Sequence, residues 1–497
     1  MKYAIEPADL IVVGAGSAGC ILATRLADRG VRVLLVEPPS GEAPKIDRQR
    51  PARWLNLLGS GEDWSFSTEA NSRLANRRLT WPRGKGLGGS SRINSMIWFP
   101  PTANDLAMLV DASGGSWNER DLQLAYQSAR DMVDPESPRW LSDASKQFMK
   151  AARELEDAQP MIYDRVNRQG RRWNPASLLS SLPPAASVQI VRATVDRILW
   201  DNDRAIGIRV SDESSSSDLM ASQGVVLCAG TIASPAILMR SGVGAKDELR
   251  RHQIDVRVQR DLVGKQLQDH LIMPVIFETE SKMKFDAAAT AQDIARWQIV
   301  GRGPLSSNIA ECGGLFSKSR VQIHVTPTHY LSYPKPSVAS VMTLGVNLTQ
   351  PQSRGSVTLG DAGLLSSPLI ETGYFENDLD AQEMIRAVSL ARSIASQTSL
   401  STWIKKELLP GSKRSGDAAI AKSIARYAQT LYHPVGTNAI SDQLDSVITP
   451  GFAVRGTERL WSVDAGVLPQ LTMGNPNATV MTLAVLASDQ VADGLDG

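Results

Sequence analysis

The stretch that decides the fold runs from Asp9 to Glu37 and reads DLIVVGAGSAGCILATRLADRGVRVLLVE. Its first apolar run, Leu10 to Val13, is typical of a buried parallel strand and ends at Gly14. A helical pattern follows at once and stops at Gly30, and a second apolar run then ends at Glu37. These three pieces predict one complete βαβ unit.

The turn inside this unit has the G-x-G-x-x-G spacing of a dinucleotide-binding motif. Its candidate binding residues are Gly14, Gly16, Ser17, Ala18 and Gly19. The glycines allow a tight turn, close approach of the backbone to a pyrophosphate, and close packing of helix on strand. Glu37 stands about 20 residues further on, where a carboxylate accepts both hydroxyls of an adenosine ribose. The unit predicts a site for NAD or FAD and leaves that choice open.

Length, charge and cysteine content narrow the class of protein. A chain of 497 residues is long enough for two domains. Its 53 Lys and Arg nearly balance 52 Asp and Glu, which argues against binding to nucleic acid or an anionic membrane. Cys20, Cys228 and Cys312 lie far apart, which argues against disulfides or a zinc site, and the first two are expected to be buried. No run approaches the roughly 20 apolar residues of a membrane span, so we expect a soluble, cytoplasmic protein without a metal.

A second glycine-rich segment, WPRGKGLGGSSRINSMIWFP, occupies residues 81–100. Its glycines let the backbone lie flat against a planar or charged group, and Arg83 and Lys85 can neutralise phosphate. The irregular, polar residues 38–80 that precede it are typical of a long excursion over a ligand. We therefore expect this segment to contact the cofactor.

Later segments return to the first sheet. Helical patterns occur at 104–132 and 143–155, and strand patterns joined by a turn occur at 187–210. Another apolar strand, 224–227, leads into a helix with Ser234 as predicted N-cap and Pro235 as its first residue. A strand that returns this late indicates a nucleotide domain assembled from separated segments.

The remaining patterns complete a two-domain α/β prediction. Residues from about 271 to 427 mix strands with helices, which favours an α+β domain that lays an antiparallel sheet over the cofactor. The C-terminal residues return to the first domain with a strand at 459–464 and a helix at 478–495. We predict a Rossmann-type nucleotide domain from residues 1–103, 186–270 and 428–497, and a substrate-binding domain from residues 104–185 and 271–427.

Six blocks of the sequence carry a family resemblance. They are GAGSAGC with Glu37, RGKGLGGSSRINSM, CAGTIASPAILMRSGVG, VGKQLQDH, YHPVGT and VDAGVLPQLTMGNPNATVMTLA. In order and spacing they resemble the FAD-dependent glucose-methanol-choline (GMC) oxidoreductases, over nearly the whole chain. The resemblance implies FAD as the cofactor. It also implies cofactor contacts for Arg83, Gly88, Gly89, Ser90, Asn94, Val195, Asp464 and Asn475.

The sequence departs from the family pattern in two ways. Some members attach their flavin covalently through a histidine shortly after the Ser-Ser pair, whereas this chain has Arg92, Ile93 and Asn94 there. We therefore expect non-covalent FAD. The segments that begin at Phe99 and at Asn438 also depart from the pattern, near the expected substrate entrance, so the resemblance does not extend to substrate specificity.

The expected reaction removes a hydride from a carbon that bears a hydroxyl, and a base must take the hydroxyl proton. Of the five histidines, His433 precedes Pro434 in a fixed geometry and stands at the position of the family's catalytic histidine. Asn475 stands where the family has His or Asn, and an amide can both donate to and accept from the substrate oxygen. In the alternative, Asn475 caps the next helix and Asn477 takes this role.

Several other residues have more than one interpretation. His270 is expected to be structural, near the domain junction. His324 and His329 belong to the second domain, where either side chain is structural or faces the pocket. A group of three aromatic residues either forms a wall of the substrate site or belongs to the core: Trp98, Phe99 and Trp461.

The leading prediction is a GMC-type FAD-dependent oxidase or dehydrogenase. It converts a primary or secondary alcohol into an aldehyde or ketone by hydride transfer to flavin N5, with oxygen or another carrier as electron acceptor. One alternative is a non-redox lyase of the hydroxynitrile lyase type, in which the flavin is structural. Another is an NAD-dependent Rossmann dehydrogenase, which predicts a colourless protein. The sequence leaves the substrate and the oligomeric state open.

Overall fold

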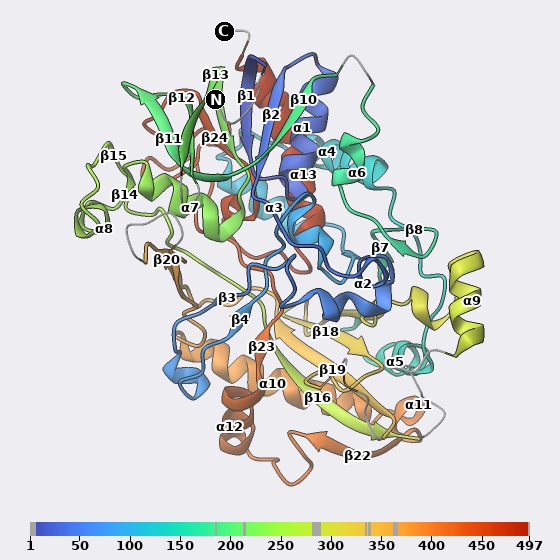
Figure 1. Ribbon diagram of the computed structural model, residues 1–497. Helices are drawn as coiled ribbons and strands as arrows, with labels where there is room; N and C mark the ends of the chain where they lie inside the picture. Colours follow the sequence, from blue (N-terminus) through green and yellow to red (C-terminus); the bar gives the residue numbers. More distant parts are fainter. Residues whose placement is uncertain are drawn as a thin grey trace.

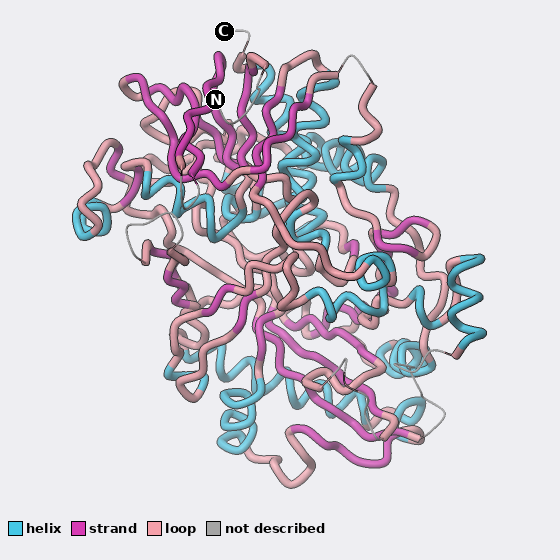
Figure 2. The backbone as a smooth tube through the Cα atoms, in the orientation of Figure 1, coloured by secondary structure: helices cyan, strands magenta, loops and turns pink. Residues whose placement is uncertain are grey.

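The computed structural model describes residues 6–183, 186–211, 215–280, 290–332, 335, 339–360 and 366–495. Two seven-stranded sheets organise these residues, one near each end of the molecule (Figure 1). Loops and short helices fill the region between the sheets, as the tube in Figure 2 shows. The α/β fold class predicted from the sequence is thereby confirmed.

The first sheet is built from segments that lie far apart in the sequence. Its strands are β1 (Ala8–Val13), β2 (Val33–Glu37), β10 (Val188–Arg192), β11 (Thr194–Asp201), β12 (Arg204–Ser211), β13 (Ser216–Leu227) and β24 (Leu460–Ser462). The order is β10-β2-β1-β13-β12-β11, with β24 paired to β13. β1 and β2 run parallel, and α1 (Ser17–Asp28) connects them, which confirms the predicted βαβ unit.

Helices cover the first sheet because its central strands are apolar on both faces. α1 packs against α13 (Asn477–Asp493), and α13 packs against α4 (Glu119–Val133). The helix predicted over 104–132 is two helices, α3 (Ala103–Ala112) and α4, since a turn interrupts the pattern at 113–117. Both helices bury residues in the same core as β1, whereas the buried residues of α5 (Asp143–Ala152) belong to the core of the second sheet. The domain boundaries themselves stay a prediction.

The predicted start of the helix after β13 was wrong. α7 (Gly230–Arg240) begins before Ser234, with Ala229 as its N-cap, so Pro235 lies inside the helix. Proline has no N–H to donate to the carbonyl four residues back, which is that of Thr231. The hydroxyl of Thr437 donates to this carbonyl at 2.7 Å instead. A residue from the C-terminal part of the chain thereby supplies the hydrogen bond that Pro235 cannot donate within the helix.

The second sheet is antiparallel and lies under the first (Figure 1). Its strands are β6 (Gln159–Ile162), β16 (Leu271–Thr279), β17 (Cys312–Phe316), β18 (Val321–Thr326), β19 (Val341–Leu348), β22 (Ile404–Leu409) and β23 (Gln429–Thr430). The order is β22-β16-β19-β18-β17-β6, with β23 paired to β16. α10 (Asp378–Ala395), α5, α11 (Thr398–Ser401) and α12 (Asp417–Tyr427) complete this half of the molecule.

Short elements make up the rest of the described chain. The helices are α2 (Lys45–Gln49), α6 (Ala176–Leu179), α8 (Lys246–Arg251) and α9 (Ala291–Val300), with 3-10 turns η1 (Pro51–Leu57), η2 (Ser72–Leu74), η3 (Gly89–Arg92), η5 (Pro304–Ser306) and η6 (Ala465–Val467). The paired strands are β3 (Phe66–Ser67) with β4 (Thr80–Trp81), β5 (Ile97–Trp98) with β7 (Asp164–Arg165), β8 (Asn167–Arg168) with β9 (Arg171–Arg172), β14 (Val243–Gly244) with β15 (Val258–Gln259), and β20 (Ser356–Thr358) with β21 (Leu369–Glu371).

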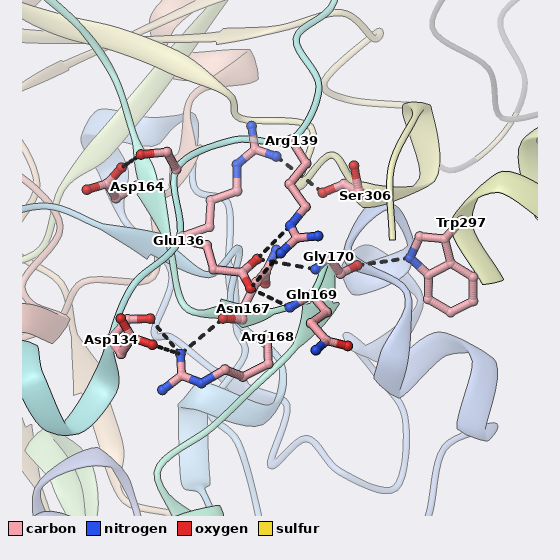
Figure 3. A network of polar contacts seen from close by, with 12 residues as sticks. Asp134, Glu136, Arg139, Asp164, Asn167, Arg168, Gln169, Gly170, Trp297 and Ser306 are labelled. Carbon is pink, nitrogen blue, oxygen red and sulfur yellow. Dashed lines mark hydrogen bonds and ion pairs between the residues drawn. The ribbon is translucent and has the colours of Figure 1, made fainter. Parts of the chain in front are cut away.

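A polar network fastens the hairpin of β8 and β9 (Figure 3). The Glu136 carboxylate accepts hydrogen bonds from the backbone N–H groups of Gln169 and Gly170 and from the guanidinium of Arg139. The carbonyl of Gly170 accepts a hydrogen bond of 2.9 Å from the indole N–H of Trp297. Because Trp297 belongs to α9, this bond ties the helix to the hairpin.

Two further properties follow from the described residues. None of their helices is both long enough and apolar enough to cross a bilayer. No group of three or more His, Cys, Asp or Glu side chains in this part of the chain could hold a metal ion.

Cys20 and Cys228 are buried, as predicted, and burial raises the pKa of Cys20 to about 12.

Candidate active site

Residues from both sheets line a cavity of about 490 Å³. The predicted site residues that line it are Gly14, Gly16, Ser17, Ala18, Glu37, Arg83, Gly89, Ser90, Asn94, Val195, His433, Asp464 and Asn475. Gly19 and Gly88, the other two predicted residues, are not among the lining residues. The cavity thus brings together the two glycine-rich segments and both catalytic candidates.

The first glycine turn is closely packed on one side and open on the other. A Cβ atom on Gly14 would lie 2.4 Å from the carbonyl oxygen of Cys228, and one on Gly19 would lie 1.9 Å from that of Gly14. At Gly16 no atom lies within 4 Å of the Cβ position. α1 begins at Ser17 without a side-chain cap, which leaves its first N–H groups free to bind a phosphate.

The second glycine-rich segment lies directly against this turn. A Cβ atom on Gly89 would lie 2.7 Å from the Cα of Gly16. The N–H of Gly88 donates to the carbonyl of Ala15 at 2.7 Å. The role of Gly88 in this structure is therefore to hold the two segments together behind the cavity wall.

Glu37 also joins the two segments. Its Oε2 accepts from the N–H of Ala15 and its Oε1 from the N–H of Gly86, both at 2.7 Å. Burial raises the pKa of Glu37 to about 7, although both hydrogen bonds act in the opposite direction. Each oxygen keeps a second lone pair, so this side chain can still accept the predicted ribose hydroxyls. Its bond to Gly86 could not be read from the motif.

Asp464 fixes the start of α7 beside the cavity. Its carboxylate accepts from the N–H groups of Gly230 at 2.8 Å and Gly466 at 2.7 Å, and from the hydroxyl of Ser234 at 2.6 Å. Burial raises the pKa of Asp464. Ser234 accepts in turn from the N–H of Ala229, so this hydroxyl does bond near the helix start although it is not the N-cap.

Two partly buried arginines orient the backbone of residues on the cavity wall. The guanidinium of Arg83 donates to the carbonyl of Tyr432, the residue before His433. Arg172, from the hairpin of Figure 3, donates to the carbonyl of Asn94 at 2.8 Å and to its side-chain oxygen at 3.2 Å. Burial lowers the pKa of Arg172 to about 9. Sequence reasoning missed Arg172, which belongs to none of the family blocks.

His433 is held in one tautomer by a chain of hydrogen bonds. Nε2 of His270 lies 2.8 Å from the backbone carbonyl of Thr349, which can only accept, so this nitrogen carries the proton. In the neutral ring, Nδ1 of His270 is then an acceptor, and it lies 2.9 Å from Nδ1 of His433. His433 therefore carries its proton on Nδ1 and presents a bare Nε2, an assignment that follows from the hydrogen bonds.

Asn475 contacts this unprotonated nitrogen of His433. Its Nδ2 lies 3.0 Å from Nε2 of His433, so the amide donates to the lone pair. Its Oδ1 is buried and has no hydrogen-bond partner among the described residues. The N-cap of α13 is Pro476, so Asn475 does not cap that helix. Asn477 also lines the cavity and accepts from the hydroxyl of Ser17 at 2.7 Å.

Burial keeps both histidines neutral. It lowers the pKa of His270 to about 4 and that of His433 well below the ordinary 6.5, and electrostatic interaction with His270, His324 and Arg83 lowers the His433 pKa further. Asp269 accepts from the backbone N–H of His433 at 2.7 Å, and burial raises its pKa to about 6. Sequence reasoning expected a structural His270 and missed its contact with His433.

The side chains whose role the sequence left open fall into two groups, those that line the cavity and those that do not. His324 lines the cavity, whereas His329 does not. Trp98, Phe99 and Trp461 are absent from the lining, and Trp98 stacks on Tyr126 within the core. An alternation in β18, Val-Gln-Ile-His-Val-Thr, was the available signal that His324 faces away from the apolar layer.

The cavity residues fit a bound FAD. The open side of Gly16 and the uncapped start of α1 offer space and N–H donors for a pyrophosphate. In the described part of the chain, the Asn475 Oδ1 and Asn477 Nδ2 atoms are buried without a partner, and both residues line the cavity. Unpaired polar atoms of this kind need a polar partner, which a flavin ring provides.

Comparison with known proteins agrees with this geometry. Two GMC oxidoreductase family models match the chain, one over residues 8–272 and one over residues 351–484. The chain is 30% identical to the alcohol dehydrogenase [acceptor] of Pseudomonas putida, over 98% of this chain and 96% of that protein. It is 32% identical to an oxygen-dependent choline dehydrogenase of Xanthomonas campestris pv. campestris, over 97% and 95%.

A solved structure shares the fold over nearly the whole chain. The crystal structure of pyridoxine 4-oxidase from Mesorbium loti superposes with a TM-score of 0.86 at 27% identity, and the match covers 97% of this chain and 99% of that one. The expected cofactor, FAD, is thereby confirmed at the level of the family. The chain belongs to the GMC oxidoreductase family and is a FAD-dependent enzyme that acts on CH–OH groups.

Proposed function

We propose that the enzyme oxidises a primary or secondary alcohol to an aldehyde or ketone, with His433 as general base and Asn475 as its partner. Bound FAD supplies the hydride acceptor, its N5 atom. The observation that carries the proposal is the unprotonated Nε2 of His433, a cavity-lining residue whose tautomer is fixed by His270 and whose Nε2 contacts Asn475. The proposed FAD contacts are those predicted residues that line the cavity, which leaves out Gly19 and Gly88.

The proton step follows from the hydrogen bonds. A substrate hydroxyl that enters beside Asn475 takes the place of the amide at the lone pair of His433 Nε2, donates to that nitrogen, and accepts from the released N–H of Asn475. As the proton moves to Nε2, the ring becomes an imidazolium whose Nδ1–H still donates to Nδ1 of His270. The low pKa of His433 keeps the base unprotonated at neutral pH. Because Asn475 cannot titrate, this is a one-base site.

Names of relatives support an alcohol donor and leave two kinds of electron acceptor. The Pseudomonas putida relative is named an alcohol dehydrogenase [acceptor], the Xanthomonas relative an oxygen-dependent choline dehydrogenase, and the solved neighbour a pyridoxine 4-oxidase. We propose oxygen or another carrier as the acceptor here. Peroxide release in air, measured beside the reduction of an added quinone, separates these two cases.

An anaerobic titration tests the redox function. The purified protein should be yellow, and a reactive alcohol should bleach its flavin absorption without added NAD. Turnover of a cyanohydrin with no spectral change would support a lyase instead. A colourless protein that requires added NAD would support a nicotinamide-dependent dehydrogenase, and either result would overturn the proposal.

A further inference from the structure

β18 is buried along its whole length, yet every second side chain is polar. Val321, Ile323 and Val325 belong to the apolar core that includes α5 and α10. Because side chains alternate along a strand, Gln322, His324 and Thr326 lie on the opposite face. A sheet face that is both buried and polar is unusual for packing and is expected where a sheet borders a ligand site.

The cavity opens on part of this polar face. His324 and Thr326 both line it, as does Gly345, which is paired with His324 in the neighbouring strand β19. Thr328 and Tyr330, which follow β18, continue the lining. This wall belongs to the second sheet, whereas the glycine-rich segments proposed to bind FAD belong to the other half of the molecule.

The polar atoms of this wall lack partners. Both ring nitrogens of His324 and Oγ1 of Thr326 are buried without a hydrogen bond to any described residue. Gln322, on the same face but not in the cavity lining, accepts from the Asn347 amide at 3.3 Å through its oxygen, whereas its Nε2 also has no hydrogen bond to a described residue. Buried polar groups in native proteins are almost always paired, so the atoms in the cavity wall are available to a bound molecule.

The wall is also uncharged. Burial and the nearby His270 lower the pKa of His324 to about 3, so its ring offers one N–H donor and one nitrogen acceptor. Among the described residues, the charged members of the lining all belong to the other half of the cavity: Glu37, Arg83, Lys85, Arg240 and Asp464. Among the described lining residues from β16, β18 and β19, none carries a carboxylate that could pair with a cationic substrate.

We propose that His324 and Thr326 form a substrate-recognition site for a neutral alcohol that carries a second hydrogen-bonding group, either a hydroxyl or a heteroaromatic ring nitrogen. This inference rests on the proposed function, since the first hydroxyl is taken to lie at His433. Positions two residues apart on a strand are separated by about 6.6 Å, a spacing that a ring substituent spans. A quaternary ammonium alcohol finds no carboxylate among the described residues of this wall.

Binding of molecules that cannot be oxidised tests the site independently of catalysis. Benzamide, nicotinamide and 3-hydroxybenzamide share one aromatic amide scaffold. Relative to benzamide, nicotinamide has a ring nitrogen and 3-hydroxybenzamide has a hydroxyl. Each is titrated into the FAD-loaded enzyme, with calorimetry and the shift of the flavin absorption as readouts. We expect at least one of the two polar probes to bind about tenfold more tightly than benzamide, as one added hydrogen bond to a buried group predicts.

Two variants identify the residues responsible. His324→Phe keeps a ring and removes both nitrogens, and Thr326→Val keeps the shape and removes the hydroxyl. We expect His324→Phe to abolish the tighter binding of the polar probes relative to benzamide. Thr326→Val should reduce this difference in part. Gln322→Met changes the same face outside the lining and should keep the preference. FAD content and melting temperature show whether each variant is folded, and Thr326→Val decides the question if His324→Phe fails to fold.

The same enzyme preparations separate this proposal from the proposed function. We expect pyridine-3-methanol or 3-hydroxybenzyl alcohol to reduce the flavin faster than benzyl alcohol, and choline to be the poorest of the set. Equal binding of all three amides to the wild type, or a polar preference that survives both His324→Phe and Thr326→Val, would overturn the recognition site. Absence of flavin reduction by every alcohol, with the binding preference intact, would instead count against the proposed function alone.

Discussion

The Nδ1 atoms of His270 and His433 lie 2.9 Å apart, and one proton must lie between them. The carbonyl of Thr349 decides which ring supplies it, because that oxygen accepts from Nε2 of His270 and leaves Nδ1 of His270 as an acceptor. His433 thereby acquires the tautomer that a general base needs. The group that sets the tautomer of the base is thus a second histidine instead of a carboxylate.

His270 is a positioning residue, and substitutions at this site should follow hydrogen-bonding capacity. His270→Leu removes both bonds and is expected to lower kcat by about 10- to 100-fold, by analogy with partners that orient metal-binding histidines. His270→Gln can still donate to Thr349 and accept from His433, so it should recover a large part of the rate. Stopped-flow flavin reduction measures both. Equal losses in His270→Leu and His270→Gln, at normal FAD content, would show that the contact has no orienting role.

The acid limb of the pH profile should lie below pH 6.5. Burial, His270, His324 and Arg83 all lower the pKa of His433, so the base stays unprotonated until the pH falls below its ordinary range. A profile of kcat/KM between pH 4.5 and 8 reports the pKa of the free enzyme. An acid limb centred above pH 7 would contradict this account of the site.

Buried neutral histidines should make the fold sensitive to acid. The pKa of His324 is lowered to about 3, so the unfolded chain takes up a proton near pH 6.5 while the folded chain does not. This contribution to stability is present above pH 6.5 and is lost as the pH falls toward 3. It amounts to about 2 kcal/mol between pH 6.5 and 5. Urea unfolding of the wild type and His324→Phe at both pH values measures it.

Comparison of the wild type with His324→Phe separates the contribution of His324 from that of buried carboxyl groups, which change the free energy of unfolding in the opposite direction on acidification. Burial raises the pKa values of Glu37 and Asp269, so their contributions change with the opposite sign over this range, but they are common to both proteins. The wild type should lose more unfolding free energy than His324→Phe on acidification. An equal loss in the two proteins would show that folding does not lower the pKa of His324.

Thr437 should stabilise α7 only because Pro235 is there. Its hydroxyl donates to the Thr231 carbonyl that Pro235 leaves without an intrahelical donor. Thr437→Val is expected to cost about 1–3 kcal/mol, the penalty of an unsatisfied buried carbonyl. In a Pro235→Ala background the helix N–H returns, and Thr437→Val should cost less. A double-mutant cycle by urea unfolding gives the coupling, and additive effects would disprove it.

Local patterns in the sequence predicted the parts of the fold that local forces determine. The apolar run before Gly14 and the acid at Glu37 specify a βαβ unit because strand, turn and helix lie within one continuous stretch. The start of α7 could not be predicted in the same way. A proline at 235 favours a helix start, and only the hydroxyl of Thr437, distant in sequence, makes its position inside the helix acceptable.

The candidate site shows the same division. His433 and Asn475 were found through their family blocks, and the contact between them joins residues that only the folded chain brings together. The pairing of His270 with His433 joins residues 163 positions apart, for which the sequence carries no local signal. The inward position of His324 was readable from the alternation in β18, but the cavity it faces depends on the packing of both sheets.

The most direct test of the central claim is the anaerobic rate of flavin reduction in His433→Ala, with a reactive alcohol at saturation. His252→Ala, a histidine outside the cavity lining, serves as the matched control. With His433 as the base, His433→Ala should retain FAD but reduce it about 10²- to 10⁴-fold more slowly than the wild type, the usual contribution of a general base, while His252→Ala should reduce it at the normal rate. A normal rate of flavin reduction in His433→Ala would contradict the assignment of His433 as the base.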